Sequence, residues 1–145
     1  MQHQIARQII LQPVEALIPY ARNSRTHSDE QVAQIAASIR EFGWTNPVLV
    51  DEADGVIAGH GRLQAAQRLE MAQVPVIVVR GLSAAQKRAL MLADNKLALN
   101  AGWDLDLLAS ELADLRDMGA DLSVVGFSAM ELDEIFRGKH SGRDP

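Results

Sequence analysis

The stretch VIAGHGRLQAA, residues 56–66, joins a short β-branched run to a helical pattern through the turn Gly-His-Gly-Arg at residues 59–62. The two glycines of this turn allow backbone conformations that other residues avoid, and they let a ligand approach the main chain closely. The first turn of the helix that follows presents unpaired N–H groups, which favour an anion. We therefore predict a phosphate-binding turn. An ordinary strand-to-helix turn with a solvated arginine is the alternative that the spacing leaves open.

The charge of Arg62 supports the phosphate hypothesis. Arg62 lies in or just before the first helical turn, where a cation opposes the helix dipole by a few tenths of a kcal/mol up to about 1 kcal/mol. An anion held between the guanidinium and the helix N–H groups would remove this conflict.

Outward from this turn, the alternation of strand and helix patterns predicts a mixed α/β core. Ser28 and Gln31 form a capping box before a helix that Gly43 ends. Asp54-Gly55 is a hairpin signal between two apolar runs. Pro75 is expected at the start of its strand, which should be buried on both faces. The expected strands are residues 5–11, 48–50, 56–58 and 74–79.

Further helices follow the core. Ser83 with Gln86, and Ser128 with Glu131, indicate two more capping boxes, and Asp104 is expected to cap the helix between them. We divide the chain into an α/β core, a helical extension and a disordered tail. The expected bounds are residues 1–82, 83–137 and 138–145.

Composition limits the classes of function. The chain has 145 residues, of which 48% are hydrophobic, and it contains no cysteine. Disulfides, thiol catalysis and cysteine-ligated metals are therefore excluded within this sequence. No run approaches the roughly 20 apolar residues of a membrane span, and no hydrophobic signal-peptide core begins the chain. We expect a cytoplasmic protein with no membrane partner.

The formal net charge of −5 argues against a whole-surface electrostatic grip on DNA. Acidic residues dominate from Asp104 to Glu134. A local basic patch near the N-terminal third remains as a route to DNA. The arginines that weight this third are Arg7, Arg22, Arg25 and Arg40.

Several motifs in order make the chain resemble the N-terminal domain of ParB proteins, within the ParB/sulfiredoxin superfamily, over residues 8–116. The turn at residues 59–62 aligns with the Gly-Glu-Arg-Arg motif of that family, and residues 93–104 are similar to ParB-like domains of phages and mobile elements. Several of those domains are fused or adjacent to DNA methyltransferases. The other matching positions are Tyr20–Arg25, Ala37–Ile39, Gly43, Asn46-Pro47 and Ala65.

This resemblance implies a small mixed sheet with flanking helices, followed by a helical subdomain. It also implies binding of CTP or another nucleoside triphosphate, with Mg²⁺. Carried over by position, Gly59, Gly61 and Arg62 hold the phosphates. Asp94 and Asn95 correspond to the family's Glu-Asn pair, which contacts phosphate and magnesium.

The loop before the first long helix also takes part in the implied site. Arg25 closes the site from the loop side, and Arg22 is the alternative for that role. His60 is expected either to donate to a phosphate oxygen or to be an exposed turn residue. No role is assigned to His27 or His140.

The chain departs from the family pattern at three places. His60 replaces the glutamate of the family turn, and Gly61 replaces its first arginine, so one guanidinium of two is missing. Asp94 is one methylene shorter than glutamate, so it is expected either to contact Mg²⁺ through water or not to bind the ion at all. Residues 104–137 are short and acidic, so we do not identify them with the DNA-reading helix-turn-helix domain of partition proteins.

Three functions stay open on the sequence. The first is a nucleotide-binding domain of DNA-associated machinery such as partition, transcription regulation or DNA modification, with slow hydrolysis at most. The second is a nuclease, although no compact carboxylate cluster with a general base is visible. The third is a nucleotide-free interaction module that partners a DNA methyltransferase or a DNA-binding domain. A homodimer is compatible with each. Sulfiredoxin activity is excluded, because it needs a cysteine.

Overall fold

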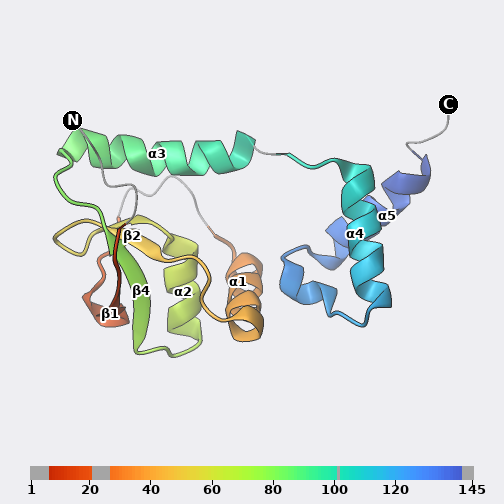
Figure 1. Cartoon of the computed structure of the whole chain (residues 1–145), viewed down its shortest axis with the longest axis horizontal. Helices are drawn as coiled ribbons and strands as arrows, with labels where there is room; N and C mark the ends of the chain where they lie inside the picture. The colour runs from red at the N-terminus through yellow and green to blue at the C-terminus, as the bar shows by residue number, and fades with distance from the viewer. Residues whose placement is uncertain (1–6, 21–26, 101, 142–145) are drawn as a thin grey trace.

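Four strands form one mixed sheet in the order β1-β4-β2-β3 (Figure 1). The computed structural model describes residues 7–20, 27–100 and 102–141. Strands β2 and β4 run parallel, whereas the β1–β4 and β2–β3 pairs are antiparallel. The strands are β1 (Ile9–Pro13), β2 (Val48–Val50), β3 (Val56–Ala58) and β4 (Gln73–Val78). The predicted mixed α/β class is confirmed.

Two strands differ from the sequence prediction. Strand β1 begins four residues later than expected and includes Pro13, while residues 1–6 lie outside the described part. Pro75 is the third residue of β4 rather than its first. It is tolerated there because pairing with β2 begins only at Val76, so the missing N–H removes no β2–β4 bond. Residues 75, 77 and 78 are half-buried, so β4 is not buried on both faces.

Helix α2 (His60–Arg68) joins the sheet to helix α1 (Asp29–Phe42) through two adjacent alanines. Ala66 packs with the valines of the sheet, and Ala65 packs with residues of α1, and both are fully buried. Small side chains at these positions allow the close approach of α2 on both sides. The predicted capping box at Ser28 is confirmed, with Gln31 N–H donating to its Oγ at 3.2 Å.

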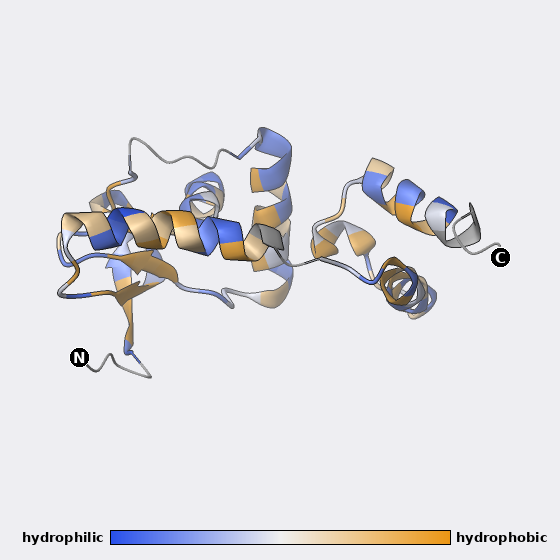
Figure 2. Ribbon diagram, turned by 90° about the horizontal axis from the view of Figure 1, so that it is seen from above, coloured by the Kyte–Doolittle hydropathy of each residue, from blue (hydrophilic) through white to orange (hydrophobic). Residues whose placement is uncertain are grey.

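Helix α3 (Ala84–Asn100) lies along β3 and crosses above the sheet (Figures 1 and 2). Its predicted cap is confirmed, because Gln86 N–H donates to Ser83 Oγ at 3.1 Å. Lys87, in its first turn, lies 3.2 Å from Asp51 and 3.6 Å from Glu52 in the β2–β3 turn. These ion pairs attach the start of α3 to the hairpin.

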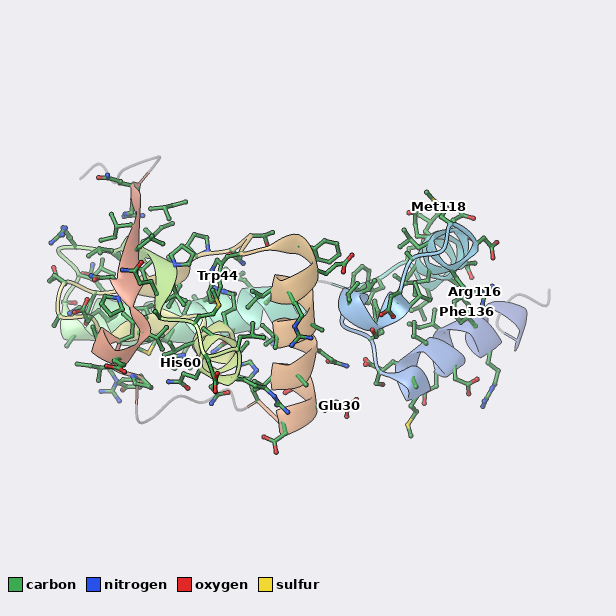
Figure 3. All side chains as sticks on the ribbon, turned by 90° about the horizontal axis from the view of Figure 1, so that it is seen from below. Glu30, Trp44, His60, Arg116, Met118 and Phe136 are labelled. Carbon is green, nitrogen blue, oxygen red and sulfur yellow. The ribbon has the colours of Figure 1, made fainter. Side chains whose placement is uncertain are left out.

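The C-terminal helices form a second, smaller part of the molecule (Figure 1). Helix α4 (Leu105–Asp117) and helix α5 (Ala129–Ser141) pack together, and Arg116 lies 4.9 Å from the ring centre of Phe136 (Figure 3). The 3-10 turn η2 (Leu122–Val125) between them packs against α1, and a shorter turn, η1 (Val14–Ala16), follows β1.

Helix α5 extends to Ser141, four residues into the segment for which the sequence predicts a disordered tail. The predicted caps at Asp104 and Ser128 are both present. Among the described residues, no helix combines the length and the apolar character that crossing a membrane requires.

Candidate functional site

The turn between β3 and α2 is built on a left-handed glycine. Gly59 has φ of +100° and is the N-cap residue of α2. A Cβ at this position would lie 3.0 Å from Arg62 Nη2 and 3.3 Å from the Cα of Val48. The left-handed backbone and the close approach of Arg62 both require glycine. As a glycine it supplies no capping side chain, so the first N–H groups of α2 remain for another acceptor.

Arg62 lies in the first turn of α2 and is half-buried. Its Nη2 donates to the carbonyl oxygen of Pro47 at 3.0 Å. Its Nε is buried and has no hydrogen-bond partner among the residues that the structure describes. Burial lowers the pKa of the guanidinium, and the charge of Asp94 acts in the opposite direction. A buried donor without a partner costs about 1–3 kcal/mol, which an anion at Nε would offset.

A cavity of about 200 Å³ lies in front of this turn. It brings together six of the residues that the sequence assigns to the site, four from the turn and two from the middle of α3. These six are Gly59, His60, Gly61, Arg62, Asp94 and Asn95. Arg22 and Arg25 fall outside the described residues. The roles of all eight residues stay predictions.

One ring nitrogen of His60 is hydrogen-bonded to the backbone of the segment that follows β1. Its Nε2 accepts a hydrogen bond from the N–H of Tyr20 at 3.2 Å. In the neutral ring the proton is then on Nδ1, which is the nitrogen that remains as a donor. Burial lowers the pKa of His60, and the nearby His27 lowers it further. His60 is half-buried in the cavity wall, so it is not an exposed turn residue, and its donation to a phosphate oxygen stays a prediction.

His27 is a cavity residue to which the sequence prediction gave no role. It lines the cavity with Arg62, and it occupies the space above Gly61. A Cβ on Gly61 would lie 2.9 Å from His27 Cε1 and 2.9 Å from Ile35 Cδ1. The available signal was its position, one residue before the Ser28 cap in a loop that carries polar side chains.

A second, larger cavity of about 390 Å³ adjoins the first. The two share His27, Ile35 and Arg62 as lining residues. The larger cavity is otherwise bounded by α1, by residues 43–46 and by the C-terminal turn η2. Trp44 is half-buried there, and its indole N–H donates to the carbonyl oxygen of Asn46 at 3.0 Å. Figure 3 shows Trp44 and His60 on the α/β part of the molecule.

The expected Mg²⁺ site depends on two residues. Asp94 is exposed and Asn95 is half-buried, and both line the smaller cavity. Within the described ranges, no group of three or more histidine, aspartate or glutamate side chains is placed to hold a metal ion. Mg²⁺ usually keeps several waters and needs few protein ligands, so a carboxylate and an amide oxygen fit it as partial ligands.

Two family models match the chain. The model described as the ParB N-terminal domain matches residues 1–96. The model described as the ParB-methyltransferase HTH domain matches residues 106–145. The second match corrects the expectation that residues 104–137 do not correspond to a helix-turn-helix domain. The matched segment contains α4 from its second residue, the turn η2 and helix α5.

Curated relatives agree with these matches. A ParB-like nuclease domain-containing protein, YnaK, from Escherichia coli is 59% identical over 80 residues, which cover 55% of this chain and 92% of that protein. A probable chromosome 2-partitioning protein ParB from Deinococcus radiodurans is 36% identical over 128 residues. That alignment covers 78% of this chain but only 43% of the partition protein.

Solved structures agree on the fold. The C-terminally truncated chromosome-partitioning protein ParB from Caulobacter crescentus, complexed with CTP-γ-S, matches with a TM-score of 0.73 at 22% identity. The match covers 90% of this chain and 77% of that protein. From residue 1 to residue 96, where the first family model matches, the chain belongs to the ParB N-terminal domain family.

Proposed function

We propose that the chain binds a nucleoside triphosphate, with the phosphates at residues 59–62, as part of DNA-associated machinery. The observation that carries this proposal is the half-buried Arg62, whose Nε lacks a partner among the described residues. Arg62 lies in the first turn of α2, which has no capping side chain for its N–H groups. Backbone N–H groups and a guanidinium are the usual ligands of phosphate. The similar Caulobacter protein was crystallised with CTP-γ-S, which makes CTP the first nucleotide to test.

The two cavities suit the two ends of a nucleotide. The smaller one offers Arg62 and the N–H groups of α2 to phosphate oxygens. The larger one has a volume in the range of small-molecule sites and contains an indole, amides and hydroxyl groups. The cavities share His27 and Arg62 as lining residues, and we infer that one ligand extends through both. We infer that the nucleoside occupies the larger cavity.

Mg²⁺ would join this site through the phosphates. The carboxylate of Asp94 and the amide oxygen of Asn95 are oxygen donors of the kind that Mg²⁺ accepts. When bound, the ion would neutralise phosphate charge. The two side chains would then hold the phosphates against α2, from the opposite side of the cavity.

Nucleotide binding is tested by calorimetry with CTP, UTP, ATP and GTP, each with Mg²⁺ and with EDTA. We expect Arg62→Ala to weaken binding by at least about tenfold, because charged hydrogen bonds contribute about 1.5–3 kcal/mol. Arg62→Ala should retain most of the fold stability, since the side chain is only half-buried. Arg88→Ala, an exposed arginine on α3, is the matched control and should bind normally.

Two results contradict the proposal. The first is that no nucleotide binds at millimolar concentration. The second is that Arg62→Ala binds as tightly as the unchanged chain. Unfolding of Arg62→Ala at room temperature would instead make Arg62 a structural residue.

We further propose that DNA, a DNA methyltransferase or a second copy of the chain is the macromolecular partner. The match to the ParB-methyltransferase HTH domain supports this range of partners. Residues 104–145 hold ten acidic residues against four Lys and Arg, so their own attraction to phosphates is weak. Gel shifts at low and high salt, with and without nucleotide, test whether DNA is the partner.

A nuclease is the second candidate, because the relative from Escherichia coli carries that term in its name. Incubation of supercoiled plasmid with Mg²⁺ or Mn²⁺ tests it. We expect any genuine nicking to be lost in Asp94→Ala, since Asp94 is the carboxylate that lines the cavity. Nicking that survives this change would point to contamination or to another site.

A further inference from the structure

The space above Gly61 is filled by an imidazole from another element. Gly61 is buried in the first turn of α2, and its φ lies outside the left-handed region. A Cβ at this position would lie 3.1 Å from His27 Nδ1 and 2.9 Å from His27 Cε1, so the imidazole would have to move to make room for it. Real Cβ atoms essentially never approach that closely. Because Gly61 has no Cβ, the imidazole of His27 can occupy the space above it.

This packing places His27 where a phosphate ligand would act. His27 lines the smaller cavity together with Arg62, and it also lines the larger one. It lies one residue before the Ser28 cap of α1, so the rigid start of α1 holds its backbone. Histidine, unlike arginine, changes charge between pH 5 and pH 8.

We propose that His27 is a phosphate ligand of this site and that its protonated imidazole makes phosphate binding stronger at mildly acidic pH. The inference rests on the proposed nucleotide site and adds to it a residue and a pH dependence. The charge of Arg62 does not change over the same range, since a guanidinium stays protonated, so Arg62 itself adds no pH dependence.

The charged groups that face His27 across the described part of the cavity decide whether a bound phosphate favours or disfavours the protonated imidazole. Helix α2 contributes Arg62, whose charge repels an imidazolium, and His60, whose charged form is disfavoured by burial. Helix α3 contributes Asp94, whose charge attracts an imidazolium. The α1 side chains that line the cavities, at residues 31, 34, 35, 38 and 39, are uncharged, as are the lining residues of η2 and the adjoining Gly126. A bound phosphate adds negative charge beside Arg62 and His27, so it favours the protonated form of His27.

The coupling between proton binding at His27 and phosphate binding gives the direction of the pH dependence. A group whose proton affinity rises on ligand binding makes the ligand bind more tightly at pH values below the pKa of the bound state. An opposite charge at about 4–6 Å shifts a pKa by about one unit or more, which corresponds to about a tenfold gain in affinity. His60 also lines the site, but its burial and its bond from Tyr20 N–H disfavour protonation.

The test compares the full chain with His27→Asn, which keeps a neutral hydrogen-bonding group near the position of Nδ1. Affinity for inorganic tripolyphosphate and for CTP is measured by calorimetry from pH 5.5 to pH 8.5. The terminal phosphate itself takes up a proton near pH 6, so the two proteins are compared with the same probe at each pH. We expect the advantage of the unchanged chain over His27→Asn to grow about tenfold from pH 8.5 to pH 5.5.

Parallel pH profiles of the two proteins would overturn the inference while leaving the nucleotide site intact. Failure of the unchanged chain to bind either probe at any pH would overturn the proposed function and this inference together. If His27→Asn does not fold, the unchanged chain decides by NMR. Tripolyphosphate should raise the pKa of the His27 imidazole by about one unit, and an unmoved titration curve would refute the assignment.

Discussion

Gly59 and Gly61 lie two residues apart, and each is a glycine for a different reason. Gly59 adopts φ of +100° and lies against Arg62, so its backbone conformation and its closeness to the guanidinium both exclude a side chain. At Gly61 a Cβ would meet the side chains of His27 and Ile35, each at 2.9 Å, so both would have to shift. The sequence motif, with its two glycines, predicts a turn. Only the contacts reveal which of them positions Arg62 and which makes room for His27.

Replacement of Gly59 by alanine tests the first of these reasons. A non-glycine residue in the left-handed region costs about 1–3 kcal/mol, and the new Cβ would also press on Arg62 Nη2. We expect Gly59→Ala to lower the free energy of unfolding by about that amount and to weaken nucleotide binding. Urea unfolding and calorimetry measure the two effects.

Gly102→Ala is the matched control for this change. Gly102 is exposed, its φ lies outside the left-handed region, and a Cβ there meets no heavy atom within 4 Å. Its stability should change by less than about 1 kcal/mol. Equal effects of the two substitutions would contradict the strained-glycine account of residue 59.

At the scale of elements, α3 depends on the hairpin beneath it. Burial alone would raise the pKa of Asp51, but hydrogen bonds from the N–H groups of Gly55 and Ala53 and from Lys87 lower it overall. The N–H of Gly81 donates to Glu52 and lowers the pKa of that carboxyl. The same contacts hold the loop before α3 and its first turn, so the position of Asp94 and Asn95 depends on them.

These shifts predict a loss of stability in acid. A carboxyl whose pKa is lower in the folded state stabilises the fold above its unfolded pKa, near 4, and this contribution falls as the pH drops through the folded pKa. We expect unfolding in urea to become easier between pH 5 and pH 3. In Lys87→Met that dependence should be shallower, because Lys87 contributes to both lowered values.

Arg88→Met is the control on the next residue of α3, where the side chain is exposed. It should keep the pH dependence of the unchanged chain. A pH profile that is identical in Lys87→Met and Arg88→Met would show that the ion pairs at the hairpin do not contribute.

At the scale of the whole molecule, the C-terminal part closes one side of the larger cavity. Val124, Val125 and Gly126 of the η2 segment line this cavity opposite α1. The two parts are otherwise separated along the long axis of the molecule (Figure 1). A ligand in the larger cavity therefore touches residues from both family matches, and its binding should depend on how η2 sits on α1.

Val124→Asp tests this dependence, because a carboxylate at a half-buried contact with α1 is desolvated. We expect CTP to bind about three- to tenfold more weakly, a change of about 0.7–1.4 kcal/mol. Inorganic tripolyphosphate should bind unchanged, because its site lies in the smaller cavity. Leu105→Asp, at a residue that is 61% exposed on α4, is the control. Equal losses for both ligands would contradict the assignment of the nucleoside to the larger cavity.

Prediction from sequence succeeded where the interaction is local. The capping boxes at Ser28, Ser83 and Ser128 are all present, because each needs only residues three positions apart. Pro75 was misplaced because its tolerance depends on where β2 begins to pair with β4. The tail prediction stopped α5 at Gly138, whereas the helix continues to Ser141.

The mixed α/β class, the starts of the capped helices and the turn at residues 59–62 follow from the amino-acid sequence alone, because periodicity, caps and glycine conformations act within a few residues. Resemblance assigned Asp94 and Asn95 to the site, and both line the smaller cavity, while their roles there stay predictions. The packing of His27 above Gly61 and the position of η2 beside the larger cavity are seen only in the three-dimensional contacts. Such contacts join residues far apart along the chain, and their energies depend on packing that no local pattern encodes.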